Sequence, residues 1–378
     1  MANSLHVLRT WQYACHVTWR PDHPYNELPP LPPATDMETV AVLKRAIEAR
    51  SAVAALDQAA RRMPNPAVLL NAIPILEAQA SSEIENIVTT TDELFRFAQD
   101  ESDRAAPETK ETLRYRTALF AGLDSVRSRP LSVTTATEIC SIVQGREMDV
   151  RKLPGTIIAS PTTRRAIYTP PQGETVVREK LANWADFIHN SDEIDPLVRM
   201  AIAHYQFEAI HPFDDGNGRT GRILNILMLV DAGLLASPIL YLSRFIIAHK
   251  DDYYRLLLDV TRDAAWEQWV LFMLAAVEAT AITTLAKIDA IQALQAAIRE
   301  QLRGTSAGAN SDLLDVLFEQ PYSRIADVIE QCAVSRPTAT KWLNELVALG
   351  VLRDVKAGRE RLFINQRFLD ILMREEEG

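Results

Sequence analysis

Cysteine is scarce in this sequence of 378 residues: only Cys15, Cys140 and Cys332 occur, and none lies in a CxxC or Cys/His pattern. This scarcity excludes a disulfide scaffold and gives no support to a zinc site. No uninterrupted apolar run reaches about 18 residues, and no apolar segment follows the first residues of the chain. Neither a membrane span nor a secretory signal is therefore expected, and a cytoplasmic location is the default.

A positive net charge is also absent. Lys and Arg number 40 and Asp and Glu number 50, which gives a formal net charge of −10. A field of this sign does not attract nucleic acid, so a contact with DNA would require a local basic patch. With 47% hydrophobic and 24% charged residues the composition is typical of a globular protein, and the length predicts two or three domains.

Glycine contributes only 13 residues, and apolar residues recur at helical spacing through most of the sequence. We therefore predict a mainly α-helical fold. Two short β-prone runs, 156–159 and 167–169, predict a small hairpin between the helices. The prolines of residues 21–33 predict an extended strap that lies against a surface. The predicted helices cover residues 39–61, about 74–87, about 93–100, 107–125, 196–210, about 223–230, about 250–260 and 266–302.

One segment carries most of the chemical information: HPFDDGNGRTGR at residues 211–222, between two predicted helices. Gly216 to Gly221 match GxGxxG, but a dinucleotide site would need a preceding strand and an acidic residue about 20 positions later. Here a helix precedes the glycines, and the nearest later acid, Asp231, follows Gly221 by only ten residues. A GxxxxGK[ST] phosphate loop is absent as well. Both standard nucleotide motifs are therefore rejected.

The residue types of this segment still indicate phosphate chemistry. Its glycines allow backbone N–H groups to approach an anion closely, at the positive end of the helix that follows. Arg219 and Arg222 are three residues apart, so both can reach the same side of the first turn. Asp215 is a suitable ligand for the Mg²⁺ that accompanies a triphosphate. His211 titrates near neutrality, as a general base requires.

The segment resembles the signature of the Fic family, HPFx(D/N)GNGRxxR, at every specified position. Members of this family typically transfer AMP from ATP to a hydroxyl of a target protein. The resemblance implies that His211 is the base, that Asp215 holds Mg²⁺ between the α- and β-phosphates, and that the loop binds the phosphates. The ATP-binding residues it implies are Asp215, Gly216, Asn217, Gly218, Arg219, Thr220, Gly221, Arg222, Tyr253 and Tyr254. For the two tyrosines, contact with adenine and packing in the core both remain open.

The predicted hairpin also fits the family, whose members carry a β-hairpin flap that aligns the target segment by main-chain pairing. An ordinary surface hairpin is the alternative. The flap residues would be Thr156, Ile157, Ile158 and Ala159.

Residues 81–86, with the sequence SSEIEN, match the inhibitory pattern (S/T)xxxE(G/N) of the family through Ser81, Glu85 and Asn86. Ser81 and Glu85 are four residues apart and would share a helix face. A carboxylate placed against Arg222 would compete with the γ-phosphate for the same guanidinium group. A solvated helix is the alternative, and Glu83, on a different face, is the second candidate.

The end of the chain resembles a winged-helix domain. Predicted helices at 313–318, 324–331 and 335–349 precede a wing hairpin at 351–364, and Arg336, Thr340, Lys341 and Asn344 point outward. Contact with DNA and contact with protein both remain open. The predicted division of the chain is 1–125 for the N-terminal strap and helices, 126–303 for the Fic catalytic core, 304–311 for a linker and 312–378 for the winged helix-turn-helix.

The function implied by the resemblance is a protein adenylyltransferase that uses ATP and Mg²⁺ and is held in check by Glu85. Its target would be a Ser, Thr or Tyr hydroxyl docked on the flap, on another protein or on its own chain, and a homodimer is compatible with the sequence. Three alternatives remain: removal of AMP at the same site, another nucleotide donor, and a nucleotide-sensing, DNA-binding regulator. Intact His211 and Asp215 favour the enzyme, because a sensor needs no base.

Overall fold

We describe the fold from a computed structural model, for residues 19–98, 105–160, 162–308, 310–357 and 360–374. The first residues of the chain with Cys15, one residue of the predicted linker and the turn of the predicted wing lie outside these ranges. The chain is mainly α-helical with two small antiparallel sheets, as the sequence predicts. The elements are α1 (Val40–Arg61), α2 (Ala67–Ile84), α3 (Thr91–Phe97), α4 (Pro107–Ser128), α5 (Val133–Gln144), β1 (Ile158–Ala159), β2 (Ala166–Tyr168), α6 (Glu174–Asn190), α7 (Pro196–Ile210), α8 (Asn217–Asp231), α9 (Leu242–Ala248), α10 (Lys250–Asp263), α11 (Trp266–Leu302), α12 (Asp312–Glu319), β3 (Tyr322–Arg324), α13 (Ile325–Cys332), α14 (Arg336–Ala348), β4 (Arg353–Ala357), β5 (Glu360–Ile364) and α15 (Gln366–Met373).

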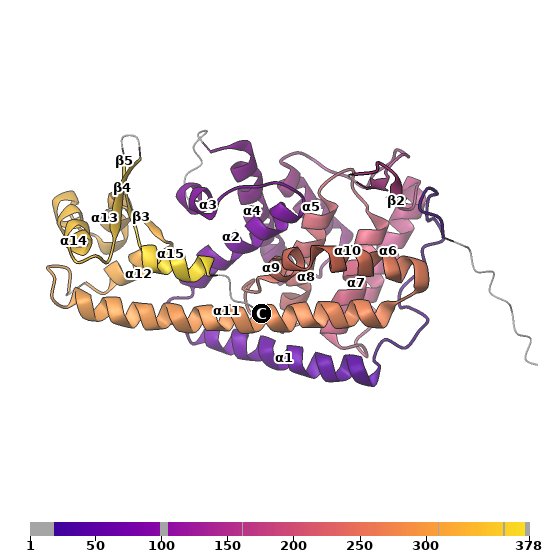
Figure 1. The fold of residues 1–378 in the computed structure, drawn as a ribbon, viewed down its shortest axis with the longest axis horizontal. Coiled ribbons are helices and arrows are strands. Elements are labelled where there is room, and N and C mark those ends of the chain that lie inside the picture. Colours follow the sequence, from indigo (N-terminus) through magenta and orange to yellow (C-terminus); the bar gives the residue numbers. More distant parts are fainter. Residues whose placement is uncertain (1–18, 99–104, 161, 309, 358–359, 375–378) are drawn as a thin grey trace, which may run out of the picture.

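Two long helices, α1 and α11, lie side by side along one edge of the molecule (Figure 1). An ion pair of 2.6 Å joins Arg45 Nη1 of α1 to Glu278 Oε2 of α11. By length and composition α11 could also cross a membrane, but 50% of its most apolar window is buried inside the protein. This burial is what a core helix requires, because its apolar side chains already have partners.

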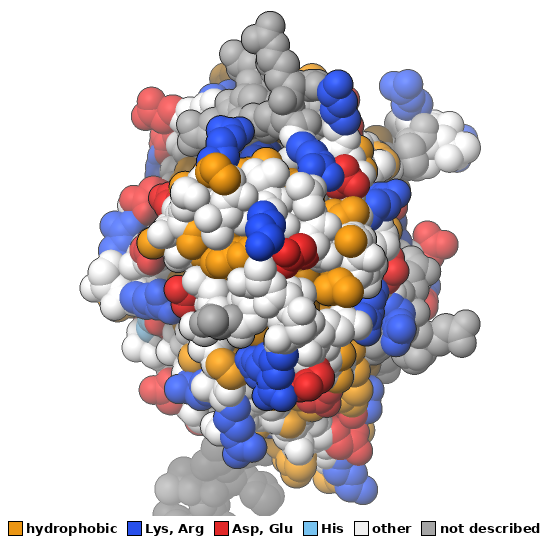
Figure 2. Space-filling model, turned by 90° about the vertical axis from the view of Figure 1, so that its left-hand side faces the viewer, with side chains coloured by type: hydrophobic (Ala, Val, Ile, Leu, Met, Phe, Trp, Pro, Cys, Tyr) orange, Lys and Arg blue, Asp and Glu red, His pale blue; other side chains and the backbone are white. Residues whose placement is uncertain are grey.

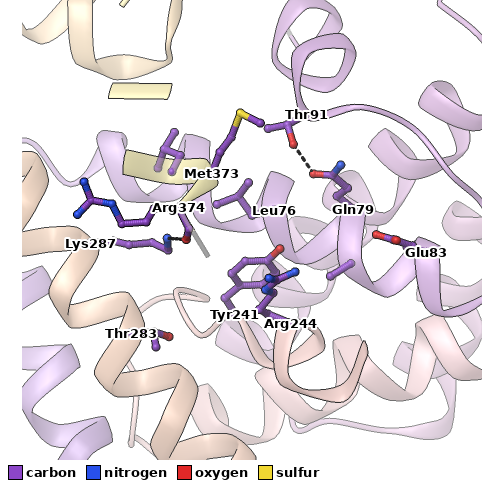
Figure 3. A pocket seen from close by; sticks show the side chains of 12 residues that line it. Leu76, Gln79, Glu83, Thr91, Tyr241, Arg244, Thr283, Lys287, Met373 and Arg374 are labelled. Atoms are coloured by element: carbon purple, nitrogen blue, oxygen red, sulfur yellow. Dashed lines mark hydrogen bonds between the residues drawn. The ribbon is translucent and has the colours of Figure 1, made fainter. Parts of the chain in front are cut away.

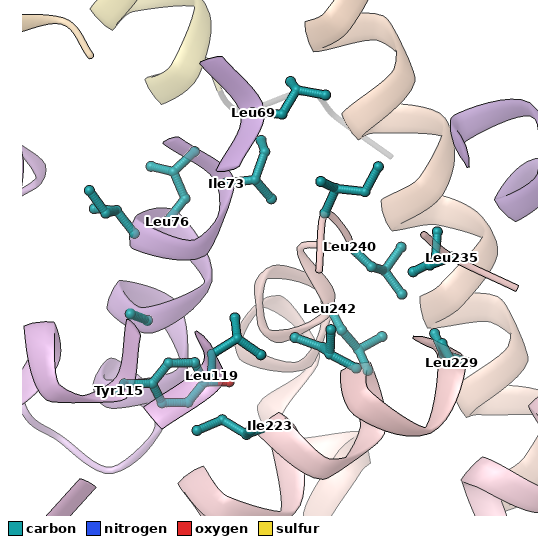
Figure 4. Close-up of a cluster of buried hydrophobic side chains, with 14 of the residues drawn as sticks. Leu69, Ile73, Leu76, Tyr115, Leu119, Ile223, Leu229, Leu235, Leu240 and Leu242 are labelled. Carbon is teal, nitrogen blue, oxygen red and sulfur yellow. The ribbon is translucent and has the colours of Figure 1, made fainter. Parts of the chain in front are cut away.

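The core that positions the site lies between α2, α4, α8 and α9 (Figure 4). α8 is buried on nearly every side, as its almost continuous apolar sequence predicts. Gly122 lets α4 approach α8 closely, because a Cβ at this position would lie 2.6 Å from Leu227 Cδ1. Loss of a buried leucine such as Leu227 to alanine typically costs about 2–5 kcal/mol of stability. This packing fixes α2 and α8 beside each other, and they carry the two sequence motifs.

The second helix differs from its prediction. The sequence suggested a start near Pro74 and an end near residue 87, whereas α2 runs from Ala67 to Ile84 with Pro74 in its interior. A proline inside a helix costs about 3 kcal/mol because one hydrogen bond is lost. The turns before Pro74 bury Val68, Leu69 and Ile73 almost completely, and this apolar burial offsets the cost.

Two features terminate α2 at its C-terminal end. Asn86 takes the left-handed conformation, with φ of 63°, and the Ile87 N–H donates to the Ser82 carbonyl at 3.0 Å. Lys250 Nζ of α10 donates to the Ile84 carbonyl at 2.6 Å. Asparagine and a cation are both favoured at such an end. Glu85 therefore follows the last helical residue instead of lying within the helix.

The predicted hairpin and strap are both present. β1 pairs with β2 in antiparallel register, with Ile158 opposite Tyr168. The strand begins at Ile158, so residues 156–157 lead into it and do not extend it. In the strap the Leu31 N–H donates to Asn183 Oδ1 at 2.7 Å, which holds the strap against α6.

At the C-terminal end, α12, α13 and α14 and the β4–β5 hairpin occupy the ranges in which the sequence predicts three helices and a hairpin, and β3 joins the hairpin in the order β3-β5-β4. The module contacts the rest of the protein. The Tyr322 hydroxyl donates to Asp92 of α3, and Lys287 Nζ of α11 donates to the carbonyl of Arg374 at 2.8 Å. Within the predicted linker, the Ser306 N–H donates to Glu345 of α14 at 2.9 Å.

The outward face of this module is mixed in charge. Figure 2 shows Lys and Arg side chains interspersed with Asp, Glu and apolar side chains over the end of the molecule that carries α14. Arg361 pairs with Asp354 at 2.8 Å, and Lys341 Nζ lies 3.8 Å from Glu345 Oε1. Neighbouring carboxylates therefore partly neutralise these cations, and DNA binding stays a prediction.

Candidate active site

The motif forms a short loop between two helices. α7 ends at Ile210, and His211 follows in the left-handed region with φ of 49°. Gly216 has φ of 81°, a conformation that suits glycine, and α8 begins at Asn217. The Asn217 side chain accepts from the Phe213 N–H and donates to the Phe213 carbonyl, both at 2.8 Å. These bonds hold the loop against the first turn of α8, whose N–H groups lack acceptors within the helix.

The predicted base, His211, lies at the start of this loop. Burial, followed by the nearby Arg151 guanidinium, lowers the pKa of His211 to about 4. This pKa is lower than the near-neutral titration expected from the sequence, because the imidazole is buried. The ring is therefore neutral at neutral pH, and a neutral ring can accept a proton. The Nδ1 atom is buried and has no hydrogen-bond partner among the described residues.

The predicted metal ligand, Asp215, is exposed at the turn before α8. Its Oδ1 accepts from the Gly216 N–H at 2.6 Å. Within the described ranges, no group of three or more His, Cys, Asp or Glu side chains gathers as a complete metal site. A single exposed carboxylate beside a helix N-terminus fits Mg²⁺ that takes its other ligands from phosphates and water.

The second arginine of the motif, Arg222, is hydrogen-bonded to Ser81 and Glu85, two residues of the inhibitory pattern. Its side chain is 1% exposed, and Nη2 lies 2.7 Å from Glu85 Oε1. The same guanidinium donates to Ser81 Oγ at 2.8 Å and to the Ser81 carbonyl at 2.9 Å. Burial is the largest single influence on Glu85 and raises its pKa, but the charge and hydrogen bond of Arg222, together with the nearby Arg219 and His211, outweigh burial and lower this pKa. Glu85 is therefore a charged partner that occupies Arg222.

The glycine at position 218 shows how closely the inhibitory carboxylate approaches the loop. A Cβ at Gly218 would collide with Glu85 Oε1 and would lie 3.0 Å from Arg222 Nη1. Only glycine leaves room for the carboxylate at this point. Glu85 thus lies directly on the glycine-rich loop that the sequence assigns to phosphate.

The first arginine of the motif has a partner that the sequence did not reveal. Arg219, with 3% of its side chain exposed, lies 2.6 Å from Glu111 Oε1 of α4. Glu111 belongs to no motif and precedes Arg219 by more than a hundred residues, so no spacing signal could have found it. In this structure both motif arginines are therefore held by carboxylates of the N-terminal helices.

The remaining predicted nucleotide residues divide into two groups. Tyr253 is buried, and its hydroxyl lies 2.8 Å from His204 Nε2. Of the two alternatives left open by the sequence, this tyrosine therefore packs in the core. Tyr254 is 45% exposed and is free to face a ligand. Thr220 is buried in α8, and Gly221 lies against Glu208 of α7, away from the space in front of the loop.

The second inhibitory candidate, Glu83, points elsewhere. It lines a pocket between α2, α9, α11 and α15, together with Tyr241, Arg244 and Lys287 (Figure 3). This pocket is separate from the motif loop. Of the two glutamates, Glu85 alone reaches Arg222, as the motif predicts.

The fold and the site together define a helical protein whose HPFDDGNGRTGR loop opens a buried helix and whose N-terminal helices cover that loop. Family models agree with this class. The Fic/DOC family N-terminal model matches residues 43–124, the Fic/DOC family model matches 130–229, and the C-terminal domain model of SoFic-like protein adenylyltransferases matches 291–368. The chain belongs to the Fic family.

Among curated proteins, the protein adenylyltransferase fic-1 of Caenorhabditis briggsae is 43% identical over 68 residues, which cover 18% of this chain and 13% of the relative. The probable protein adenylyltransferase aq_aa38 of Aquifex aeolicus is 43% identical over 72 residues, or 18% of this chain and 22% of the relative. The chain thus matches less than a quarter of the length of either relative. A Fic family protein from Desulfovibrio desulfuricans G20 has the same fold, with a TM-score of 0.56, 21% identity, and coverage of 88% of this chain and 98% of that one.

Proposed function

We propose that this chain is a protein adenylyltransferase that transfers AMP from ATP to a Ser, Thr or Tyr hydroxyl of a target protein, including its own, and that Glu85 inhibits it. The observation that carries the proposal is the contact of Glu85 with Arg222 inside a complete HPFxDGNGRxxR loop. A carboxylate that pairs with Arg222 can inhibit the reaction only if a phosphate group of the substrate binds the same guanidinium group. The names of the matched relatives support the same activity.

In the proposed reaction His211 accepts the proton of the target hydroxyl, whose oxygen attacks the α-phosphorus of ATP. A bond forms between that oxygen and the phosphorus, and the bond to the bridging oxygen breaks, so pyrophosphate leaves with the electron pair. The N–H groups at the start of α8 and Arg219 face the charge that develops on the phosphates. Mg²⁺ bound through Asp215 would neutralise the leaving pyrophosphate.

In the proposed resting state the triphosphate cannot take its productive position. Glu85 and Ser81 use three hydrogen bonds of Arg222 between them. A γ-phosphate would have to displace the Glu85 carboxylate, and it would meet that negative charge if it failed to do so. ATP bound beside a seated Glu85 has its α-phosphorus out of line with the incoming hydroxyl.

We place the target segment on the flap. The residues 157–159 are exposed, and the apolar side chains Ile157 and Ile158 are 53% and 36% exposed. An exposed strand edge pairs with an extended segment through main-chain groups and accepts many target sequences. The division at 125, 303 and 311 into N-terminal helices, catalytic core, linker and C-terminal module belongs to the same proposal.

The proposal is tested with two samples of ATP, one labelled at the α-phosphate and one at the γ-phosphate, in the presence of Mg²⁺. We expect the α label to become protein-bound and the γ label to remain in solution, with intact-protein mass rising by one AMP. Removal of Mg²⁺ should abolish labelling. Labelling from the γ position alone would mean phosphate transfer and would overturn the assignment.

A further inference from the structure

An arginine outside the motif is buried directly beneath the base. Arg151 lies between α5 and β1 and is 2% exposed. Its Nε donates to the His211 carbonyl at 2.7 Å, and its Nη2 donates to the Ile210 carbonyl at 3.1 Å and to the Pro171 carbonyl. Its own backbone N–H donates to the Pro212 carbonyl at 2.9 Å. One residue therefore holds three consecutive carbonyls around the base.

The chemistry of these contacts is unusual for a buried cation. Among the described residues, all hydrogen-bond partners of the Arg151 side chain are main-chain carbonyl oxygens, and none is a carboxylate. Burial of a charge without a paired carboxylate is costly. The carbonyls at the end of α7 partly offset this cost, because they lack helical partners and carry the negative end of the helix dipole.

The backbone that Arg151 holds is strained. His211 has φ of 49°, and a residue with a Cβ in this region costs about 1–3 kcal/mol, which the surroundings must supply. The guanidinium group binds the carbonyl of Ile210, which precedes His211, and the carbonyl of His211 itself. It therefore holds the left-handed conformation of His211 directly. The contact with Pro171 adds a second function, because Pro171 follows β2 and ends the flap.

We propose that Arg151 is a positioning residue for the transfer reaction: it holds His211 in the left-handed conformation and ties the base of the flap to the same point. The imidazole and the hydroxyl that the flap presents are thereby brought to one place. Arg151 touches neither the nucleotide nor the reacting atoms. The inference rests on the proposed function, and it adds a residue that the HPFxDGNGRxxR signature does not contain.

The first test uses the Glu85→Gly protein as the active parent and compares Arg151→Ala with Arg116→Ala. Arg116 is the control: it is an arginine of intermediate exposure on α4, and it donates to Asn71 Oδ1 at 3.0 Å and to no residue of the motif loop among the described hydrogen bonds. We expect Arg151→Ala to lower kcat about a hundredfold with little change in the KM for ATP, the effect of misplacing a group by about 1 Å. Arg116→Ala should keep the parental kcat. Equal losses in both variants, or a parental kcat in Arg151→Ala, would overturn the inference.

Chemical rescue separates positioning from general destabilisation. Methylguanidinium at millimolar concentration should enter the space left in Arg151→Ala and restore part of kcat, because it reproduces the planar donors. Methylammonium carries the same charge but lacks the planar set of N–H donors, so it should not restore kcat. Equal rescue by both ions, or by neither, would contradict the assigned role.

A third measurement does not depend on activity, so it also tests the inference if the parent fails to incorporate the α label and the proposed function falls. Arg151→Lys keeps a cation and is the variant of choice if Arg151→Ala does not fold. With ¹³C-labelled histidine, the backbone carbon shifts of His211, assigned by their loss in His211→Asn, report its left-handed conformation. We expect these shifts to move in Arg151→Lys, and unchanged shifts would overturn the inference.

Discussion

A glutamate inside α2 and the glutamate that follows its last residue lie in different environments. Glu77 is buried inside α2, where it accepts from the Tyr115 hydroxyl at 2.9 Å, from the Ser243 N–H at 2.8 Å and from the Ser243 hydroxyl. Glu85 follows the last turn of α2, has 35% of its side chain exposed, and forms an ion pair with Arg222. Glu77 thus joins α2 to α4 and α9, whereas Glu85 joins α2 to the catalytic loop.

The two carboxyl groups also differ in the direction of their pKa shifts. Burial raises the pKa of Glu77 above its ordinary value, although three donors oppose this. For Glu85 burial is also the largest single influence, but the charge and hydrogen bond of Arg222, with Arg219 and His211, together outweigh it and lower the pKa. The difference teaches that a carboxylate at a helix end can form an ion pair outside the core, as the proposed inhibitory role of Glu85 requires, whereas one inside the helix takes part in core packing. The predictions below test that contrast.

Replacement of His211, the proposed base, should have the largest effect on AMP transfer. His211→Ala in the Glu85→Gly protein should lower AMP transfer by about 10²–10⁴-fold, the usual cost of losing a general base. ATP binding should persist, because His211 acts on the hydroxyl and not on the phosphates. Transfer is measured by incorporation of the α label and binding by titration calorimetry. Persistent transfer would mean that Glu85 regulates some other reaction.

The next effect should come from Glu85 itself. Glu85→Gly frees Arg222 for the γ-phosphate, and a charge-assisted hydrogen bond is worth about 1.5–3 kcal/mol, so labelling should rise at least about tenfold. Glu83→Gly is the matched control, two residues away and lining a different pocket. An equal rise in the control would remove the inhibitory assignment and leave the signature-based assignment standing.

Glu77 should affect stability and not regulation. Glu77→Gln places an amide nitrogen among three donors, and the unsatisfied groups should lower the free energy of unfolding by about 1–3 kcal/mol. Urea denaturation followed by circular dichroism measures this change, with Glu83→Gln as the exposed reference. If the stability of Glu77→Gln were unchanged while labelling rose, the roles of the two glutamates would have to be exchanged.

The smallest effects should appear in the pH dependence of stability. Because the pKa of Glu85 is lowered on folding, its contribution is complete above the ordinary carboxyl value of 4.5 and is lost as pH falls through the folded pKa. The raised pKa of Glu77 has the opposite sign: its penalty grows as pH rises above 4.5. Denaturation midpoints measured from about pH 3 to 8 should therefore fall less steeply on the acid side in Glu85→Gln, and less steeply at higher pH in Glu77→Gln, than in the parent protein.

Much of the helical fold could be predicted from periodicity. The predicted bounds of α7 and α11 agree with the structure, because a proline or a tryptophan-led apolar pattern marks their starts. The prediction for α2 began too late, since Pro74 was read as a first-turn proline when burial of the preceding turn overrides it. The helices α5 and α6 were not predicted: the Ser132 and Gly145 boundary signals of α5 were missed, and α6 begins after Gly173 without a side-chain cap.

The candidate site was only partly predictable for a related reason. The contact of Glu85 with Arg222 was expected because a family pattern links two segments that are distant in sequence. Glu111 and Arg151 reach the same loop from outside any recognised pattern, so only the packing of α4 and of the segment before β1 reveals them. Single-sequence patterns specify faces and ends of helices, but not which charged groups meet across the fold.

The contacts of the C-terminal module with α3 have a mechanical consequence. Tyr322 of β3 donates to Asp92, Arg324 donates to the Arg96 carbonyl at 3.2 Å, and both acceptors lie on the helix that follows Glu85. Gln79 of α2 in turn donates to the Thr89 carbonyl at 2.9 Å, which ties the short segment between α2 and α3 back to α2. A force that separates β3 from α3 therefore pulls on the chain just beyond Glu85. If Glu85 inhibits as proposed, a partner that displaces the C-terminal module is expected to alter the contact of Glu85 with Arg222 without binding at the motif loop.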